Sequence, residues 1–203
     1  FSGNIRRDGS SKLLKENRYV TTYSVGANWI MSEEDFLKGS KVSNLRLRAS
    51  YATTANQDLI TGRGTIADDF PAFGLYSQGV YADGLAFFQN NVPVPDLKWE
   101  RRLKSNFGID FGFFENRITG SVNLYNDVTK DLFFPRQLSR TSGFTSLLVN
   151  VGELRNRGIE FEIAADALKL GDFTWRLSGN ITYNQNKVLK VLPDQEEIAS
   201  ATD

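Results

Sequence analysis

The sequence predicts an all-β fold of antiparallel strands, and it favours a transmembrane β-barrel. Three observations lead to this prediction: apolar and polar residues alternate with period two, several alternating stretches are ten or more residues long, and the connections differ in length at the two ends. A strand of a globular protein averages about five or six residues, whereas a membrane-spanning strand needs about nine to eleven. The stretches are therefore long enough to cross a membrane.

The alternation is clearest in residues 45–51, 106–113 and 173–183. Odd positions in these stretches are apolar at 13 of 14 places, and even positions at 0 of 12. A helix would space its apolar residues three and four apart, so these stretches are strands with one oily and one polar face. Read in chain order, about seven strands are expected: one ending near Ile5, then 19–30, 44–54, 98–113, 118–130, 149–165 and 173–185.

The connections between these strands are unequal. Residues 55–97 and 131–148 form the two longest, and both lie at the same end of the sheet when strand directions are counted. The opposite end has the tight turn ENR at 115–117, the short segment 165–172 and a segment near 31–44. Within that last segment, SEEDFL predicts a short helical turn with Ser32 as its N-cap. This asymmetry is typical of outer-membrane barrels, which have short periplasmic turns and long external loops.

Aromatic residues lie at both ends of the strands, on the oily face. Tyr19 and Trp29 are ten residues apart, as are Phe173 and Tyr183. At about 3.3 Å per residue and a tilt near 40°, ten residues rise about 25 Å, which matches the apolar band of a bacterial barrel. We therefore expect these side chains to face lipid or to form the two aromatic girdles: Tyr19, Trp29, Tyr51, Trp99, Phe107, Ile109, Phe111, Phe113, Phe173, Trp175 and Tyr183.

The opposite face carries charged residues, and burying them unpaired in a dry core would cost several kcal/mol each. We expect this face to be wet and to line a lumen: Arg46, Arg48, Arg102, Lys104, Asp110, Glu160, Glu162 and Arg176. Alternation alone also fits the surface of a soluble sheet. A secreted β-sandwich that binds carbohydrate therefore remains the alternative.

Composition narrows the function. The net charge is zero, so bulk electrostatics does not favour nucleic acid. The chain has no Cys and no His, which removes thiol chemistry, the usual general base and the commonest metal ligands. The acids Asp68, Asp69 and Asp83 lack the spacing of a calcium loop. We expect no catalytic residue, no metal and no cofactor, and hence a protein that is not an enzyme.

Several motifs, in their order along the chain, resemble one family. They are NIRRDGSSKL (4–13), YSVGANWIMSEEDFLK (23–38), LRLRASYATTANQ (45–57), LKWERRLKSNFGIDFGFFENRITGSVNLYNDVTKDLFF (97–134), NVGELRNRGIEFEI (150–163) and FTWRLSGNITYNQNKVLKV (173–191). Together they are similar to the SusC/RagA-like TonB-dependent outer-membrane transporters of Bacteroidetes-type bacteria. The resemblance covers nearly the whole chain except residues 58–95. Ala52 and Ala55 stand where the family often has Gly.

The resemblance implies that residues 1–203 are a section of a 22-stranded barrel with a plugged lumen, without the plug and the remaining strands. It implies import of glycan or peptide nutrients across the outer membrane of a Gram-negative bacterium. The implied partners are a SusD-like surface lipoprotein, the TonB complex acting through a missing N-terminal part, membrane lipid and an oligosaccharide or peptide substrate. The chain starts without Met and ends in a polar stretch, so a fragment is expected.

Residues 55–97 are expected to form a long extracellular loop. Six aromatic residues in it are candidates for contact with the substrate or with the lipoprotein lid: Phe70, Phe73, Tyr76, Tyr81, Phe87 and Phe88. Ring faces offer apolar platforms for such contacts. The competing interpretation is that these rings form a small core for the loop itself, because a long loop needs a surface to pack on.

Overall fold

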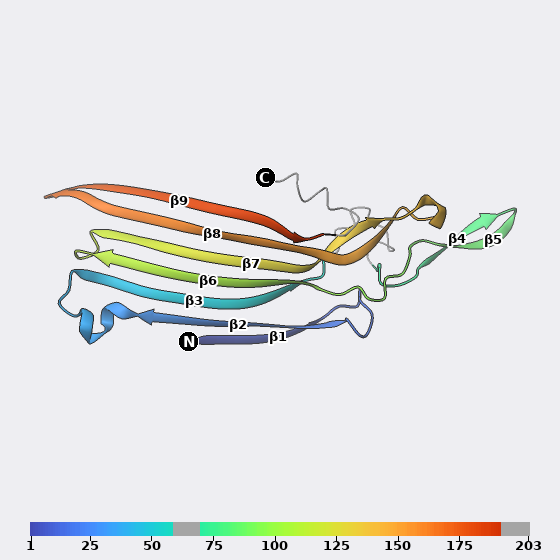
Figure 1. Ribbon diagram of the computed structural model, residues 1–203, viewed down its shortest axis with the longest axis horizontal. Helices are drawn as coiled ribbons and strands as arrows, with labels where there is room; N and C mark the ends of the chain where they lie inside the picture. Colours follow the sequence, from blue (N-terminus) through green and yellow to red (C-terminus); the bar gives the residue numbers. More distant parts are fainter. Residues whose placement is uncertain (59–69, 192–203) are drawn as a thin grey trace.

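The computed structural model, which describes residues 1–58 and 70–191, consists of one long antiparallel sheet and one small hairpin (Figure 1). The sheet has seven strands in the order β1-β2-β3-β6-β7-β8-β9, and every neighbouring pair is antiparallel. Strands β4 and β5 form the separate hairpin. The predicted all-β, antiparallel fold with about seven strands is therefore confirmed.

Most strands are longer than those of a globular sheet. Their bounds are β1 Ser2–Gly9, β2 Tyr19–Ile30, β3 Val42–Asn56, β4 Tyr76–Tyr81, β5 Gly84–Gln89, β6 Glu100–Phe113, β7 Ile118–Gln137, β8 Ser146–Leu170 and β9 Phe173–Lys190. The connections after β2, β6 and β8 lie at one end of the sheet, called here the short-turn end. The connections after β1, β3 and β7 lie at the other, the long-loop end (Figure 1).

The expected long connection at 131–148 is wrong, because β7 and β8 continue to pair through most of it, as far as Gln137 and Ser146. Strand β7 leaves β6 after Lys130, where the β7–β8 register is irregular. Asn150 fills the break: its side-chain amide donates to the carbonyl oxygens of Asp131 (2.7 Å) and Lys98 (2.8 Å), and its oxygen accepts from Lys98 N (2.9 Å). An amide that bonds both backbone groups replaces the missing strand partner.

The short-turn end also differs in detail from the sequence prediction. The helical turn near SEEDFL is present as two 3₁₀ helices, η1 Met31–Glu33 and η2 Asp35–Leu37, but Ser32 is not an N-cap, because it lies inside η1. Strand β8 runs on to Leu170, so the predicted connection at 165–172 shrinks to a two-residue turn. The β8–β9 hairpin consequently reaches further than its neighbours at this end (Figure 1).

The sheet is a single layer. Within the described part of the chain, the buried apolar residues form one small cluster at the long-loop end, while large apolar side chains along the strands remain exposed, including Ile5 (75%), Ile181 (68%) and Phe107 (41%). A β-sandwich needs a second sheet about 10 Å away to cover such a face. No second layer packs here among the described residues, so the sandwich alternative is wrong.

No helix in residues 1–58 and 70–191 is both long and apolar enough to cross a membrane. The long connection between β3 and β6 contains the β4–β5 hairpin, which projects past the end of the seven-stranded sheet (Figure 1). A third 3₁₀ helix, η3 Arg140–Ser142, closes the β7–β8 hairpin.

Candidate functional site

The strand pairing assigns the alternating residues to two faces. Phe107 pairs with Leu124, Leu124 with Ile159, and Ile159 with Tyr183. Directly paired residues of antiparallel strands point to the same side of a sheet. The apolar sets of β6, β7, β8 and β9 therefore form one continuous face. The row that contains Trp29 crosses the sheet from β2 to β9 in the same way, through Leu47, Ile109, Val122, Phe161 and Ile181.

The rim aromatics run diagonally across this apolar face. Ile181 on β9 lies in the row of Trp29. Phe173 lies eight residues closer to the short-turn end than Ile181. If the strand registers are extended beyond the paired residues, the row of Tyr19 meets the line of β9 at residue 191, eight residues beyond Tyr183. Both aromatic rows thus shift by the same amount between β2 and β9, which are five strand steps apart. The two rows are parallel.

This shift gives a strand tilt. Eight residues over five steps is about 1.6 residues, or about 5.3 Å, for each strand spacing of about 4.8 Å. The corresponding angle is about 48°, slightly above the 35–45° of typical membrane barrels, and ten residues then rise about 22 Å. The rows are thus spaced as the borders of an apolar membrane band would be. The lipid and girdle assignments themselves stay a prediction.

Aromatic residues near the borders also make polar, cation–ring or ring–ring contacts. The Trp29 indole Nε1–H donates to Glu34 Oε1 (2.8 Å), the Arg7 guanidinium lies 4.8 Å from the centre of the Tyr19 ring, and the rings of Tyr23 and Tyr51 are 6.1 Å apart. Trp and Tyr are favoured where one side of the ring is apolar and the other is wet. These contacts fit that situation.

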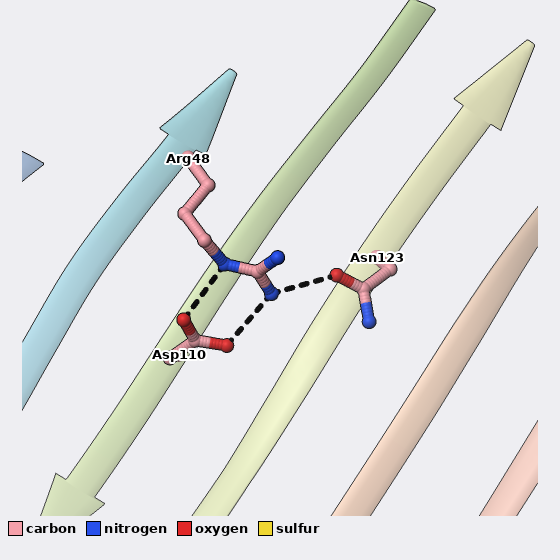
Figure 2. Close-up of polar contacts among 3 residues, drawn as sticks. All are labelled: Arg48, Asp110 and Asn123. Atoms are coloured by element: carbon pink, nitrogen blue, oxygen red, sulfur yellow. Dashed lines mark hydrogen bonds and ion pairs between the residues drawn. The ribbon is translucent and has the colours of Figure 1, made fainter. Parts of the chain in front are cut away.

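The opposite face is polar and joins three strands through one arginine. Arg48 on β3 donates from Nε and Nη2 to the two carboxylate oxygens of Asp110 on β6, each at 2.8 Å, and from Nη2 to Asn123 Oδ1 on β7 at 3.0 Å (Figure 2). Bidentate guanidinium–carboxylate contacts are the strongest of the charge-assisted hydrogen bonds. The arginine therefore fixes β3, β6 and β7 relative to each other on the polar side.

Gly108 makes this crossing possible. It pairs with Arg48 on one side and with Asn123 on the other, so it lies in the middle of the row that the guanidinium crosses. A Cβ atom there would come within 2.8 Å of Asn123 Oδ1 and 3.0 Å of Arg48 Nη2. A residue with a side chain at this position would push the guanidinium away from its partners.

Further ion pairs lie on the polar face. Arg102 Nη2 is 2.6 Å from Asp127 Oδ2, and Arg176 Nε is 2.7 Å from Asp166 Oδ1. A hollow of 690 Å³ opens beside Arg48 and Glu160. The register puts all eight residues that were predicted to line the lumen on this one face: Arg46, Arg48, Arg102, Lys104, Asp110, Glu160, Glu162 and Arg176. What that face contacts in the whole protein stays a prediction.

Sequence reasoning missed Asn123, Asp127 and Asp166 on this face. On β7 the apolar positions are even-numbered, which could have revealed Asn123 and Asp127 as polar-face residues. Asp166 shares the even parity of Glu160 and Glu162 on β8, and it was missed because that strand was expected to end near residue 165. No cluster of acidic residues that could hold a metal ion occurs in the described ranges. Asp68 and Asp69 lie outside those ranges.

The buried cluster at the long-loop end overturns one girdle assignment. Trp99 is only 7% exposed, packs with Leu13, Val20 and Leu97, and donates from its indole Nε1–H to Arg18 O at 3.2 Å. The prediction that Trp99 faces lipid or forms part of a girdle is therefore wrong. The reason is that β6 begins only at Glu100, so Trp99 precedes the strand and folds into the loops.

The six loop aromatics divide into two groups. Phe73 packs against the buried cluster, and its ring centre is 6.2 Å from that of Phe70, so these two belong to the loop's own core. The other four lie on the β4–β5 hairpin and are strongly exposed: Tyr76 (64%), Tyr81 (75%), Phe87 (69%) and Phe88 (47%). Their contact with substrate or with the lid stays a prediction.

Comparison with known proteins agrees with this geometry. A family model described as "TonB dependent receptor-like, beta-barrel" matches residues 1–201. The chain is 37% identical over 200 residues to "TonB-dependent receptor SusC" of Bacteroides thetaiotaomicron, which covers 94% of the chain and 19% of that protein. It is also 37% identical over 200 residues to "TonB-dependent receptor P3" of Formosa agariphila, covering 98% and 19%.

Solved structures give the same result. The chain matches "Structure of the RagAB peptide transporter" with a TM-score of 0.79 and 28% identity, over 93% of this chain and 20% of that one. Structures of the RagAB peptide importer in the "closed-closed" and "open-open" states match with TM-scores of 0.79 each, both at 27% identity. The chain spans about a fifth of the length of these relatives.

Proposed function

The chain belongs to the TonB-dependent receptor-like β-barrel family, and we propose that the protein containing it imports nutrients across a bacterial outer membrane. The observation that carries the proposal is the single-layer sheet with an apolar face between two parallel aromatic rows and a polar face opposite. Such a wall separates lipid from a wet interior. Residues 1–203 are then part of the barrel domain, and residues 55–97 a loop at its outer mouth.

In this proposal the seven strands act as a rigid wall rather than as a moving part. The chain matches the "closed-closed" and "open-open" RagAB structures equally well, at a TM-score of 0.79 each. Equal fits to both states are what a segment of unchanged shape would give. The ion pairs across β3, β6 and β7 support the same role, because charge-assisted contacts hold neighbouring strands together on the lumen side.

The substrate is proposed to be an oligosaccharide or a peptide. The relative named SusC and the RagAB peptide transporter are both similar to this chain. The exposed rings of Tyr76, Tyr81, Phe87 and Phe88 are proposed to contact the substrate or a SusD-like surface lipoprotein that covers the mouth. The TonB complex is the proposed energy source, through parts of the protein beyond these residues. We propose no catalytic role.

Uptake by whole cells tests this function. Deleting the complete gene should abolish uptake of at least one fluorescently labelled oligosaccharide or peptide that the parent strain takes up. Reintroducing the gene should restore uptake, and a protonophore should abolish it again, since TonB-dependent import is energised. Unchanged uptake across panels of both substrate types, in the deletion strain and with the protonophore, would contradict the proposal.

A further inference from the structure

We propose that the outer wall of the barrel carries a binding surface for the phosphate groups of an anionic lipid headgroup. The surface lies on the apolar side of the sheet, beside the aromatic row at the long-loop end. It rests on the proposed membrane location. It consists of five cationic residues: Arg101 on β6, Lys130 on β7, Arg155 and Arg157 on β8, and Lys187 on β9.

Strand register puts these five residues on the same face as the predicted lipid contacts. Arg157 is two residues from Ile159 along β8 and therefore points to the same side. Arg155 pairs with Lys187, and Arg101 pairs with Lys130. On β7, Lys130 is two residues from Val128, and Val128 pairs with Arg155 on β8. Arg155 is in turn two residues from Arg157, so the cationic residues form one group across four adjacent strands.

The group begins where the apolar band ends. The aromatic row at the long-loop end shifts by about 1.6 residues per strand between Tyr19 and Tyr183. It therefore crosses β8 close to Arg157. The other four cations lie about one to four residues further towards the long-loop end. Lipid headgroups lie at this depth, next to the interfacial aromatic belt.

The charge on this surface is not balanced locally. On the polar face, Arg48 and Arg102 have carboxylate partners within 2.8 Å. On the outer face, in contrast, Lys130 has a weak partner, Glu153, with 3.9 Å between nitrogen and oxygen. Five positive charges thus face one carboxylate.

Four of these cations have no carboxylate within 4.0 Å in the part of the chain that the structure describes: Arg101, Arg155, Arg157 and Lys187. Arg155 Nε is shielded from solvent and has no hydrogen-bond partner there either. Arg157 donates to the neutral Gln185 Oε1 at 2.9 Å. An unneutralised group of this kind attracts anions from its surroundings.

The position of the surface selects the kind of anion. The five cations lie on the apolar face of the sheet, with Phe107 and Ile159, and not on the polar face that carries the hollow beside Arg48. The molecule that meets this side in a membrane is lipid. Guanidinium groups bind phosphate oxygens in a bidentate manner, and Lys and Arg clusters beside a membrane bind anionic headgroups.

Native mass spectrometry of the full-length protein tests the proposal. In detergent micelles with added phosphatidylglycerol or phosphatidylcholine, the wild type should retain phosphatidylglycerol preferentially. Each cation near an anionic headgroup is worth about fivefold in affinity at low salt. The double variant Arg101→Gln/Lys187→Gln should therefore lose phosphatidylglycerol binding by about tenfold or more.

A matched control comes from the opposite face. Arg46→Gln/Lys104→Gln removes the same charge from β3 and β6 on the polar side and should leave lipid retention unchanged. The charge-preserving variant Arg101→Lys/Lys187→Arg should retain most of the binding. Equal loss in the control, equal retention of both lipids, or displacement by inorganic phosphate at the lipid concentration would overturn the proposal.

Two further outcomes are decisive. If the glutamine variant does not fold, as judged by heat-modifiable migration, wild-type retention must still fall when NaCl rises from about 50 to about 500 mM, because salt screens exposed charges. Lipid retention that does not change with NaCl concentration would refute the proposed binding surface. If the variant instead loses an acidic protein partner while lipid retention is unchanged, the surface is a protein contact. The membrane location is tested separately, by Ile109→Arg.

Discussion

At the scale of single residues, Ile109 and Asn106 report on the two faces of the same strand. Both lie on β6, and Ile109 belongs to the apolar face, where it pairs with Leu47 and Val122. In the full-length protein, Ile109→Arg should lower the free energy of unfolding by about 2–4 kcal/mol, because an Arg near the middle of a bilayer is poorly solvated. Denaturant titration after refolding into lipid vesicles measures this change.

Asn106→Arg is the matched control. Asn106 is exposed, belongs to the polar face and borders the hollow beside Arg48. The same new charge should therefore change stability by less than about 1 kcal/mol. Equal destabilisation by the two substitutions would contradict the assignment of lipid to the apolar side.

Gly108 gives a second residue-scale prediction. In Gly108→Ala, the new methyl group should displace the Arg48 guanidinium from Asp110 and Asn123, at a cost of about 1 kcal/mol for partly exposed contacts. Gly179→Ala is the control, since no atom lies within 4 Å of the Cβ position there.

A double-mutant cycle with Arg48→Met separates this mechanism from a general effect of replacing glycine. If the methyl group acts through the guanidinium, Gly108→Ala should cost much less in the Arg48→Met background, so the two changes should not be additive. Additive effects in denaturant titrations would show that Gly108 matters for another reason.

At the scale of elements, the long-loop end is held by packing rather than by strand pairing alone. Trp99 and Leu97 pack against Val20 at the start of β2 and Leu13 in the preceding loop. Trp99→Ala should cost about 3–5 kcal/mol locally, as expected for emptying a buried aromatic site. Hydrogen exchange should accelerate in residues 10–20 and 70–99, while the middle of β6 should remain protected.

Trp29→Ala is the control for this prediction, since Trp29 lies at the opposite end of the sheet and is 48% exposed. It should leave exchange in residues 10–20 unchanged. If the two tryptophans instead behave alike, with exchange altered only when lipid is present, then Trp99 is an interfacial residue after all and the buried cluster is not its functional environment.

At the scale of the whole molecule, the seven strands form an open sheet. Strands β1 and β9 each have one neighbour among the described strands, so each has an edge of unpaired backbone groups. Such edges cannot remain unsatisfied in lipid and promote aggregation in water. A recombinant piece spanning residues 1–203 should therefore form oligomers or aggregates in detergent, whereas the full-length protein should refold to a monodisperse species.

Size-exclusion chromatography with light scattering distinguishes the two results. A monomeric, vesicle-inserted piece with protease-resistant strands would show that the wall is stable without closure of the barrel. That result would contradict the idea that the remaining strands are needed to satisfy β1 and β9.

Much of the architecture was predictable from residues alone, because a period of two leaves one interpretation for stretches such as 106–113. The polar-face arginines 46 and 48 followed from the same parity. The extension of β7 to Gln137 was not predictable, since DLFFPRQ contains Pro and no clean alternation. The pairing of this extension with β8 continues past a register irregularity, and Asn150 bonds the backbone of Lys98 beside that irregularity. Both features depend on contacts between residues far apart in sequence.

Residue order is enough to establish long strands with an oily and a wet side, since side-chain direction in a strand depends only on position parity. Which residues of different strands meet depends on the folded sheet. It joined Arg48 to Asp110 and Asn123, buried Trp99 in the loops, and aligned five cations from four strands beside the aromatic border. These contacts could not be read from alternation, because alternation does not specify the pairing register, which sets the relative shift of neighbouring strands.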